Sequence, residues 1–306
     1  MSRPVLIDAN SLLMRCIMAS ALEDLSVGGV FTGGLYASLN SLRDVLSQEE
    51  VDAGRVYAFF DHSPPPFRRA LFPNYKLGRV APRMLDPETY ERAKEQIRHA
   101  FALWPTLGIA CMRYVEREAD DAIGAAVMEF SARKIRPVIV SGDRDMFQFA
   151  DVADIWFLSK EPYLVCPDDW PTDLCPRDQY RLFRALVGDA SDGLTGVKGC
   201  GPAGALKILA ETKATTLDEL RQALPKLKQS HVVQQVAASA EVIERMLKVM
   251  DLRKSFGNRR GLVERLDTPA TLDQRAFVAQ CKQWSFKSIY LGDVQSFLVP
   301  FRRCLA

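Results

Sequence analysis

Nine carboxylates in five short clusters are the residues of this chain best suited to chemistry. They are Asp8; Asp61; Glu118, Asp120 and Asp121; Asp143 and Asp145; and Asp189 and Asp192. If these side chains were packed together without cations, their negative charges would repel one another strongly. Hard divalent cations bind oxygen ligands and neutralise such groups, so the acids favour a site for Mg²⁺ or Mn²⁺.

Three of the clusters follow apolar runs of strand length. Residues 4–7 lead into Asp8, residues 56–60 into Asp61, and residues 137–140 lead toward Asp143. Continuous runs of this kind are typical of buried parallel strands. Ligands of open α/β sheets bind outside the carboxyl ends of the strands, so we expect the three acids to converge on one crevice.

The first part of the chain alternates between strand and helix patterns. Helices are expected over residues 11–21, 35–46, 88–104 and 122–130, with a loop between Gly28-Gly29 and Gly33-Gly34 and a further strand over 109–112. This βαβ pattern predicts a parallel sheet. Glu118 and Asp121 precede the last helix three positions apart and should share one face. Alternatively, the acids there complement the helix macrodipole.

From about Pro176 onward the pattern is mostly helical. The expected helices cover residues 177–187, 202–211, 216–224, 232–252 and 272–284. We therefore expect an α/β part over 1–175 and a helical part over 176–306.

A glycine-rich turn at residues 196–201 separates two of these helices. Gly199 and Gly201 permit a close approach of another molecule, and Pro202 suits a first helical position. The free N–H groups of the following helix would face an anion, which favours a grip on DNA phosphates without base specificity. A plain helix end and loop is the alternative. The adjacent Lys198 and acids favour a phosphodiester substrate.

Residues 63–83 lose periodicity and are expected to form a loop outside the core. This stretch carries five cations with no acid between them, Arg68, Arg69, Lys76, Arg79 and Arg83. Such a run would guide a nucleic-acid strand, and the ring of Tyr75 could stack on a base.

Composition limits the remaining possibilities. The 306 residues are 48% hydrophobic, and the net charge is only +2, so affinity for a polyanion must come from local basic segments. Seven cysteines without a C-x-x-C pair and three histidines do not favour zinc, and the cysteines indicate reduced thiols in the cytoplasm. The sequence shows no leader and no run of membrane-spanning length, so no membrane association is expected.

The ordered motifs resemble the 5′ nuclease family, which includes bacteriophage 5′ exonucleases, the 5′ nuclease domain of bacterial DNA polymerase I and flap endonucleases. The matching segments are residues 8–15, 60–61, 67–68, 75–79, 118–121, 141–145, 188–192 and 196–201. The resemblance spans roughly residues 4–290. Departures from the family pattern are Gly193, Thr195 and Cys200, none of them a metal ligand.

The resemblance implies a Rossmann-like (PIN-like) α/β nuclease core, a helical arch or gateway over about residues 63–105, and a helix-three-turn-helix (helix-hairpin-helix) element that grips duplex DNA. It assigns Asp8, Asp61, Glu118, Asp120 and Asp121 to one Mg²⁺ and Asp143, Asp145, Asp189 and Asp192 to a second, with Mn²⁺ able to substitute and K⁺ at the hairpin. The implied catalytic residues are Lys76, Arg79, Asp8, Asp61 and Asp121. The implied DNA contacts are Arg15, Arg68, Arg69, Tyr75, Lys76, Arg79, Arg83, Lys198, Gly199, Gly201 and Lys207.

The implied activity is two-metal hydrolysis of phosphodiester bonds at or near the 5′ ends of flap, nicked or branched duplex DNA, by flap endonuclease and 5′-3′ exonuclease action, with 5′-phosphate products. The expected state is a monomer without a fused polymerase that works with a separate one. Three alternatives compete. An inactive clamp on branched DNA would be expected to lack acids, a PIN-type ribonuclease does not explain the glycine-rich turn, and a phosphatase using Asp143 and Asp145 leaves the other acids without a role.

Overall fold

The computed structural model describes residues 2–20, 25–77, 87–171, 174–257 and 259–305. The chain forms two compact units. The first comprises Met1–Ser63, Ala81–Leu164 and Arg253–Ala306, and the second comprises Pro64–Val80 and Val165–Leu252. A single division at residue 175 therefore differs from the observed grouping, because residues 253–306 belong with the α/β unit and residues 64–80 with the helical one.

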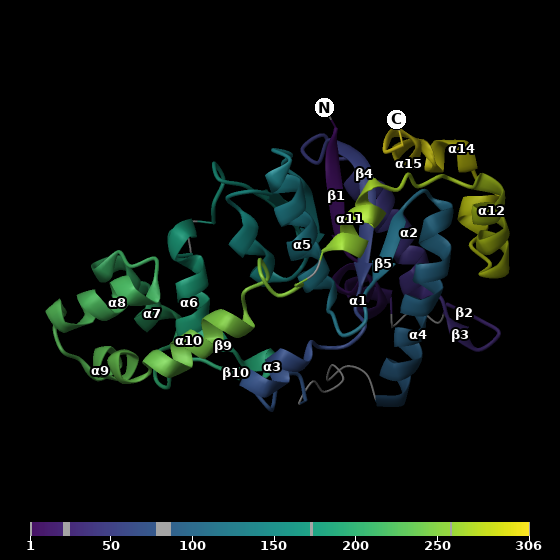
Figure 1. The fold of residues 1–306 in the computed structure, drawn as a ribbon. Coiled ribbons are helices and arrows are strands. Elements are labelled where there is room, and N and C mark those ends of the chain that lie inside the picture. Colours follow the sequence, from purple (N-terminus) through teal and green to yellow (C-terminus); the bar gives the residue numbers. More distant parts are fainter. Residues whose placement is uncertain (1, 21–24, 78–86, 172–173, 258, 306) are drawn as a thin grey trace. The chain divides into compact units, whose positions relative to one another are not determined.

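A six-stranded sheet organises the first unit, in the order β5-β4-β1-β6-β7-β8. Figure 1 labels three of its strands, β5, β4 and β1. The strands are β1 (Arg3–Asp8), β4 (Ala53–Phe60), β5 (Ala110–Arg113), β6 (Val138–Ser141), β7 (Asp154–Phe157) and β8 (Tyr163–Val165). The pairings β1 with β4, β1 with β6, β4 with β5 and β6 with β7 are parallel. The prediction of a parallel sheet is confirmed, and the three acid-bearing strands β4, β1 and β6 are neighbours.

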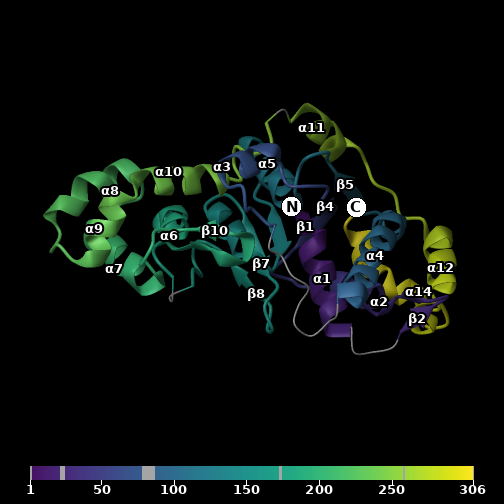
Figure 2. The ribbon, with the colours of Figure 1, turned by 90° about the horizontal axis from the view of Figure 1, so that it is seen from below.

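Helices cover both faces of this sheet (Figure 2). On one side lie α1 (Ala9–Ser20), α2 (Gly33–Leu46) and α4 (Pro87–Leu103), and on the other lie α5 (Ala119–Ala132) and α11 (Arg260–Asp267). The alternation of strand side chains explains this arrangement. Ile7 belongs to the hydrophobic cluster that also contains residues of α1 and α2. On the other face, the ring of Tyr57 packs against Phe130 of α5, and the Tyr57 hydroxyl donates to the Leu266 carbonyl.

The C-terminal helices complete the core of the first unit. They are α12 (Gln274–Gln283), α13 (Lys287–Tyr290), α14 (Val294–Phe297) and α15 (Val299–Arg303), and the 3-10 turns of this unit are η1 (Trp104–Thr106) and η2 (Arg144–Phe149). Phe277 and Phe301 are buried in the same cluster as the residues of α1 and α2. Their burial explains why residues 253–306 return to this unit.

The second unit is helical. It contains α3 (Pro66–Leu71), α6 (Tyr180–Val187), α7 (Pro202–Thr212), α8 (Leu217–Ala223), α9 (His231–Ala238), α10 (Ala240–Val249), the short strands β9 (Gly188–Asp189) and β10 (Leu194–Thr195), and the turns η3 (Arg177–Gln179), η4 (Ala190–Asp192) and η5 (Leu224–Lys226). The helical prediction is confirmed, except that the helix expected over 232–252 divides at Ser239 and ends at Val249. Among the described residues of both units, no helix has the length and apolar character needed to cross a bilayer.

The expected loop before α2 is in part a short hairpin. Strands β2 (Ser26–Val27) and β3 (Val30–Phe31) pair around Gly28 and Gly29, both of which have positive φ. Gly34 lies inside α2 and not in a loop. Because glycine has no side chain, α2 can approach α1 closely at this position. A Cβ atom at Gly34 would lie 2.4 Å from Cγ1 of Ile17.

Gly34→Ala is therefore expected to lower the free energy of unfolding by roughly 2–4 kcal/mol through overpacking between α1 and α2. Urea denaturation measures the change. Gly261→Ala is the matched control, because a Cβ there meets no atom within 4 Å and alanine favours the helix α11. Equal stability of the two variants would contradict the close approach.

Candidate metal centre

Asp8 and Asp61 occupy the carboxyl ends of adjacent strands. β1 ends at Asp8, and Asp61 follows β4 directly. The Ala119 N–H donates to Oδ1 of Asp61 at 2.7 Å, which ties this carboxylate to the first turn of α5. Asn10 accepts the Asp61 N–H at 3.0 Å. Residues far apart in the sequence thus meet at one edge of the sheet.

The three acids at the start of α5 form the most compact carboxylate group. Glu118, Asp120 and Asp121 each offer an oxygen, and these oxygens lie within 4.8 Å of one another. Asp121 is 0% exposed, and its Oδ2 accepts the Glu118 N–H at 3.1 Å as part of a capping box. The side chains of Glu118 and Asp121 thus lie close together, as their spacing of three positions predicts, and they also form the cap of the helix. An all-oxygen group of this kind fits a hard divalent cation.

Asp8 experiences the repulsion expected of clustered acids. The Ser11 N–H donates to its Oδ1 at 3.0 Å, and the Ser141 hydroxyl donates to its Oδ2 at 2.8 Å. Burial, followed by the negative charges of Asp61 and Asp143, nevertheless raises the pKa of Asp8 to about 7. A bound cation would remove this penalty, so the electrostatics also fit a metal.

Asp8 is therefore expected to make the metal-free protein less stable as pH rises. The folded carboxyl holds its proton up to about pH 7, whereas the unfolded one has an ordinary value near 3.8, so stability falls between these values. In EDTA, Asp8→Asn should remove this loss and gain on the order of 2–4 kcal/mol over the wild type above pH 7. Urea denaturation across this pH range tests it, with the exposed Asp44→Asn as control. Parallel pH profiles of the wild type and Asp8→Asn would contradict the expectation.

Asp143 and Asp145 follow β6. Asp143 caps the turn η2, and its Oδ1 accepts the Asp145 N–H at 2.8 Å. The Asp143 N–H donates to Oγ of Ser141 at 3.0 Å, and Ser141 in turn donates to Asp8. Ser141 thus links the ends of β6 and β1. Ser141, Ser11 and Asn10 are not among the site residues predicted from the sequence, although each stands within three residues of a predicted acid.

Asp189 and Asp192 belong to the second unit. Burial alone raises the pKa of Asp189, but hydrogen bonds from Ser191 and the Arg184 guanidinium outweigh burial and hold the pKa below its ordinary value. Arg184 Nη2 lies 3.0 Å from Oδ2 of Asp189. Oδ2 of Asp192 lies 3.7 Å from Nζ of Lys76. That these two acids join the seven of the first unit stays a prediction.

In its described part, residues 63–77, the basic stretch contains the helix α3 and buried side chains, which corrects the interpretation as a loop outside the core. Arg68 lies in α3 and is only 1% exposed. Its Nε donates to the Val249 carbonyl at 3.1 Å, and its guanidinium lies over the rings of Phe67 and Tyr75. Tyr75 is 3% exposed. Both side chains are therefore buried within the second unit. A planar guanidinium can be buried when it packs against aromatic rings and donates to a carbonyl. This burial contradicts the predicted direct contacts of Arg68 and Tyr75 with DNA.

Arg68→Ala is accordingly expected to destabilise the protein by about 2–4 kcal/mol, because it empties a buried site and leaves the Val249 carbonyl without this donor. The exposed neighbour Arg69→Ala should change stability by less than about 0.5 kcal/mol. Urea denaturation of both variants measures this difference. If Arg68→Ala kept full stability and instead reduced the salt dependence of DNA binding, Arg68 would be a phosphate contact after all.

The other predicted contacts fall into three groups. Lys76 lies beside Asp192. Its ammonium is 5.1 Å from the centroid of the Tyr75 ring, and its backbone N–H donates to the Asp192 backbone carbonyl at 2.9 Å. Arg79 and Arg83 lie outside the described residues. Exposed side chains or backbone are found at Arg15, Arg69, Lys198, Gly199, Gly201 and Lys207.

The glycine-rich turn has room for another molecule. Gly199 has a φ of +80°, and a Cβ at Gly199 or Gly201 would meet no atom within 4 Å. Gly201 is the N-cap of α7, with Pro202 at the first helical position. The Val197 N–H donates to the Leu186 carbonyl at 2.8 Å and fixes the turn to the end of α6.

Comparisons with known proteins agree with these features. Residues 3–166 match the family model "5′-3′ exonuclease, N-terminal resolvase-like domain". The 5′-3′ exonuclease of Bacillus subtilis is 30% identical over 242 residues, covering 75% of this chain and 77% of that protein. The thermostable DNA polymerase I of Thermus thermophilus is 31% identical over 254 residues, covering 82% of this chain but 29% of that protein. The chain thus spans less than a third of the polymerase I relative.

Solved structures share the fold. The bacteriophage T5 5′-exonuclease with bound zinc has a TM-score of 0.66 at 17% identity, over 99% of this chain and 100% of that one. A bacteriophage T5 flap endonuclease in complex with DNA and metal ions gives the same TM-score and identity, over 92% of this chain and 99% of that one.

Proposed function

The chain belongs to the 5′-3′ exonuclease family, and from that premise we propose that it is a metal-dependent 5′ nuclease. Its substrates would be 5′ flaps, nicked or branched duplexes and single-stranded 5′ ends of DNA, cut to leave 5′-phosphate products. The observation that carries the proposal is the convergence of Asp8, Asp61 and the Glu118, Asp120 and Asp121 group at the carboxyl edge of the sheet.

The acids would hold the divalent cations. When bound, such ions activate water and neutralise charge on the phosphate. Asp8, Asp61 and the three acids of α5 supply oxygen donors for one site. The sheet edge and the capping box hold these carboxylates in fixed positions, and such preorganisation favours catalysis. We assign Asp143, Asp145, Asp189 and Asp192 to the second site.

Basic groups of the second unit would bind the substrate. Lys76 pairs with Asp192, so its ammonium is oriented and can exchange this partner for a phosphate oxygen. Arg79 would assist Lys76 at the scissile phosphate. The exposed backbone around Gly199 and the first turn of α7 would grip the DNA backbone, as a helix-hairpin-helix does.

We further propose which cations, which compartment and which partner protein the nuclease uses. Mg²⁺ would be the natural cation, with Mn²⁺ able to substitute, and K⁺ would bind at the glycine-rich turn. The protein would act as a cytoplasmic monomer together with a separate DNA polymerase.

A cleavage assay tests the proposal. A 5′-labelled flap, a nicked duplex and a single strand are each incubated with Mg²⁺ or with EDTA, and product lengths are read on a gel. Cleavage of the flap and the nicked duplex only with Mg²⁺ supports a 5′ nuclease. Tight binding without cleavage would indicate an inactive clamp, and preference for an RNA strand would indicate a PIN-type ribonuclease. Either result would overturn the proposal.

A further inference from the structure

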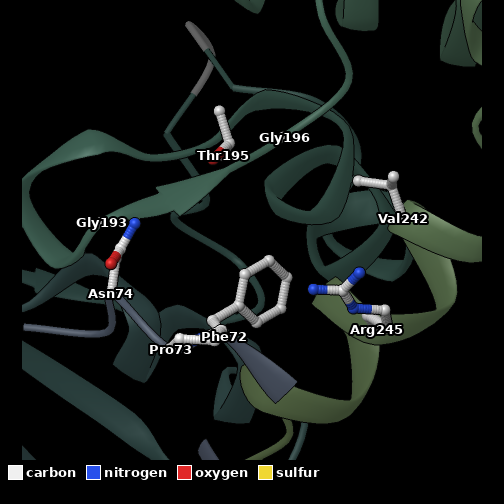
Figure 3. Close-up of a pocket in the computed structure, with 8 residues that line it drawn as sticks. All are labelled: Phe72, Pro73, Asn74, Gly193, Thr195, Gly196, Val242 and Arg245. Carbon is white, nitrogen blue, oxygen red and sulfur yellow. The ribbon is translucent and has the colours of Figure 1, made fainter. Parts of the chain in front are cut away.

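A pocket of about 330 Å³ lies within the second unit (Figure 3). Its walls come from the segment after α3, from the turn around β10 and from α10. The side chains and backbone that matter here are Phe72, Asn74, Gly193, Thr195, Val242 and Arg245. None of them is among the DNA contacts that the family resemblance implies.

The pocket combines a cation with an aromatic ring. The guanidinium of Arg245 points toward Phe72 and lies 4.7 Å from the ring centroid (Figure 3). Its Nη2 donates to the Leu71 carbonyl at 2.6 Å. A guanidinium carries five N–H donors, so this bond leaves others for an anion. Thr195 adds a hydroxyl and Asn74 an amide, while Val242 supplies an apolar wall.

The wall formed by the turn is fixed by the backbone. A Cβ at Gly193 would lie 2.6 Å from the Asn74 carbonyl oxygen, and Gly193 has a φ of +70°. The Lys76 N–H donates to the Asp192 carbonyl in the same region. The segment that carries Lys76 and the turn that carries Asp192 are therefore held together, and the pocket is part of that arrangement.

We propose that this pocket receives one nucleotide of the DNA substrate, with its phosphate on Arg245 and its base beside Phe72 and Val242. The inference rests on the proposed function. A guanidinium next to an aromatic ring suits the joined phosphate and base of a nucleotide better than an apolar ligand or a bare anion. The volume lies at the low end of the range for small-molecule sites, which suits a single nucleotide. Gly193 adjoins Asp192 and Asn74 stands two residues before Lys76, so the bound nucleotide would lie on the same part of the second unit as these two residues.

Binding of flap DNA in EDTA tests this site without any contribution from turnover. A set of flaps, each with one abasic position, is titrated by fluorescence anisotropy. In the wild type, one abasic position should weaken binding by about fivefold or more, because a base that packs on an aromatic ring contributes about 1–3 kcal/mol. Arg245→Met should weaken binding of the intact flap about tenfold. Val242→Phe, which fills the pocket and leaves the Leu71 contact in place, should remove the effect of that abasic position.

Lys248→Met is the matched control, since Lys248 is an exposed cation of the same helix, paired with Glu244. It should bind every flap nearly as the wild type does, and urea denaturation confirms that each variant is folded. The proposed nucleotide site is disproved if the wild type binds every abasic flap with equal affinity. It is also disproved if the Val242→Phe variant keeps the loss of affinity at the one abasic position. A wild type that cleaves flaps with Mg²⁺ but shows a flat abasic scan disproves the pocket alone, whereas a protein that cuts no DNA disproves the nuclease proposal.

Discussion

Replacing Asp121 by asparagine is expected to lower the turnover of 5′-flap hydrolysis by roughly 10³-fold, with less than about a threefold change in flap binding measured in EDTA. Asp121 is fully buried, and its carboxylate belongs to the compact group with Glu118 and Asp120. Asparagine keeps the shape and one oxygen that can accept the Glu118 N–H, so the cap of α5 should persist. The variant removes one negative charge from the proposed cation site and leaves the DNA contacts unchanged.

Glu129→Gln is the matched control for this variant. Glu129 lies near the other end of α5, where it forms a partly exposed ion pair with Arg133 at 2.9 Å. Such pairs contribute little to stability, and this one lies far along the helix from the acid group. Turnover should stay within about twofold of the wild type. If Asp121→Asn cleaved flaps as fast as Glu129→Gln, the acids of α5 would have no part in the reaction.

Lys76→Met is expected to lower turnover by about 10²–10³-fold, the usual cost of removing one positioned group that stabilises charge in a transition state. Its ammonium sits over the Tyr75 ring and beside Asp192, so the group is oriented before substrate arrives. Methionine keeps most of the stem of the side chain and loses only the charge. Single-turnover kinetics with saturating enzyme separates this loss of rate from a loss of binding.

Lys282→Met provides the comparison, because Lys282 is an exposed cation of α12, outside the segment over residues 63–105 that the resemblance implies as an arch. It should cleave at the wild-type rate. Asp192→Asn combined with Lys76→Met should show a non-additive loss, since the two side chains interact directly. Full activity of Lys76→Met would show that Lys76 takes no part in the mechanism. If the double variant lost activity by the product of the two single-variant losses, the ion pair between Lys76 and Asp192 would have no role in catalysis.

The sequence predicted the sheet and its acids well because buried parallel strands leave a simple pattern. Each apolar run ends at or just before a carboxylate, and the structure places β4, β1 and β6 side by side. The helix after Glu118 could also be predicted, because capping acids and a following apolar run mark its start. The serines that hold Asp8 could not be singled out, since hydroxyl groups are common and only the fold brings Ser141 to β1.

Tertiary packing decided the features that the sequence analysis predicted wrongly. The stretch around Arg68 shows cations and prolines but no period, so it was expected to be a loop. Arg68 is instead buried between two rings and the carbonyl of Val249, a residue 181 positions later in the chain. Likewise, Phe301 packs with the helices of the first unit, and no linear pattern connects it to them. Contacts at such separation are set by the fold, and local propensity does not encode them.

Anomalous diffraction from crystals grown with Mn²⁺ would show whether the clustered carboxylates bind two cations. We expect one strong peak coordinated by the carboxylates of Asp8, Asp61 and the Glu118, Asp120 and Asp121 group, and a second one coordinated by Asp143, Asp145, Asp189 and Asp192. In crystals of Asp121→Asn the first peak should weaken or vanish. Manganese bound elsewhere on the protein, with these carboxylates holding no ion, would contradict the proposed metal site.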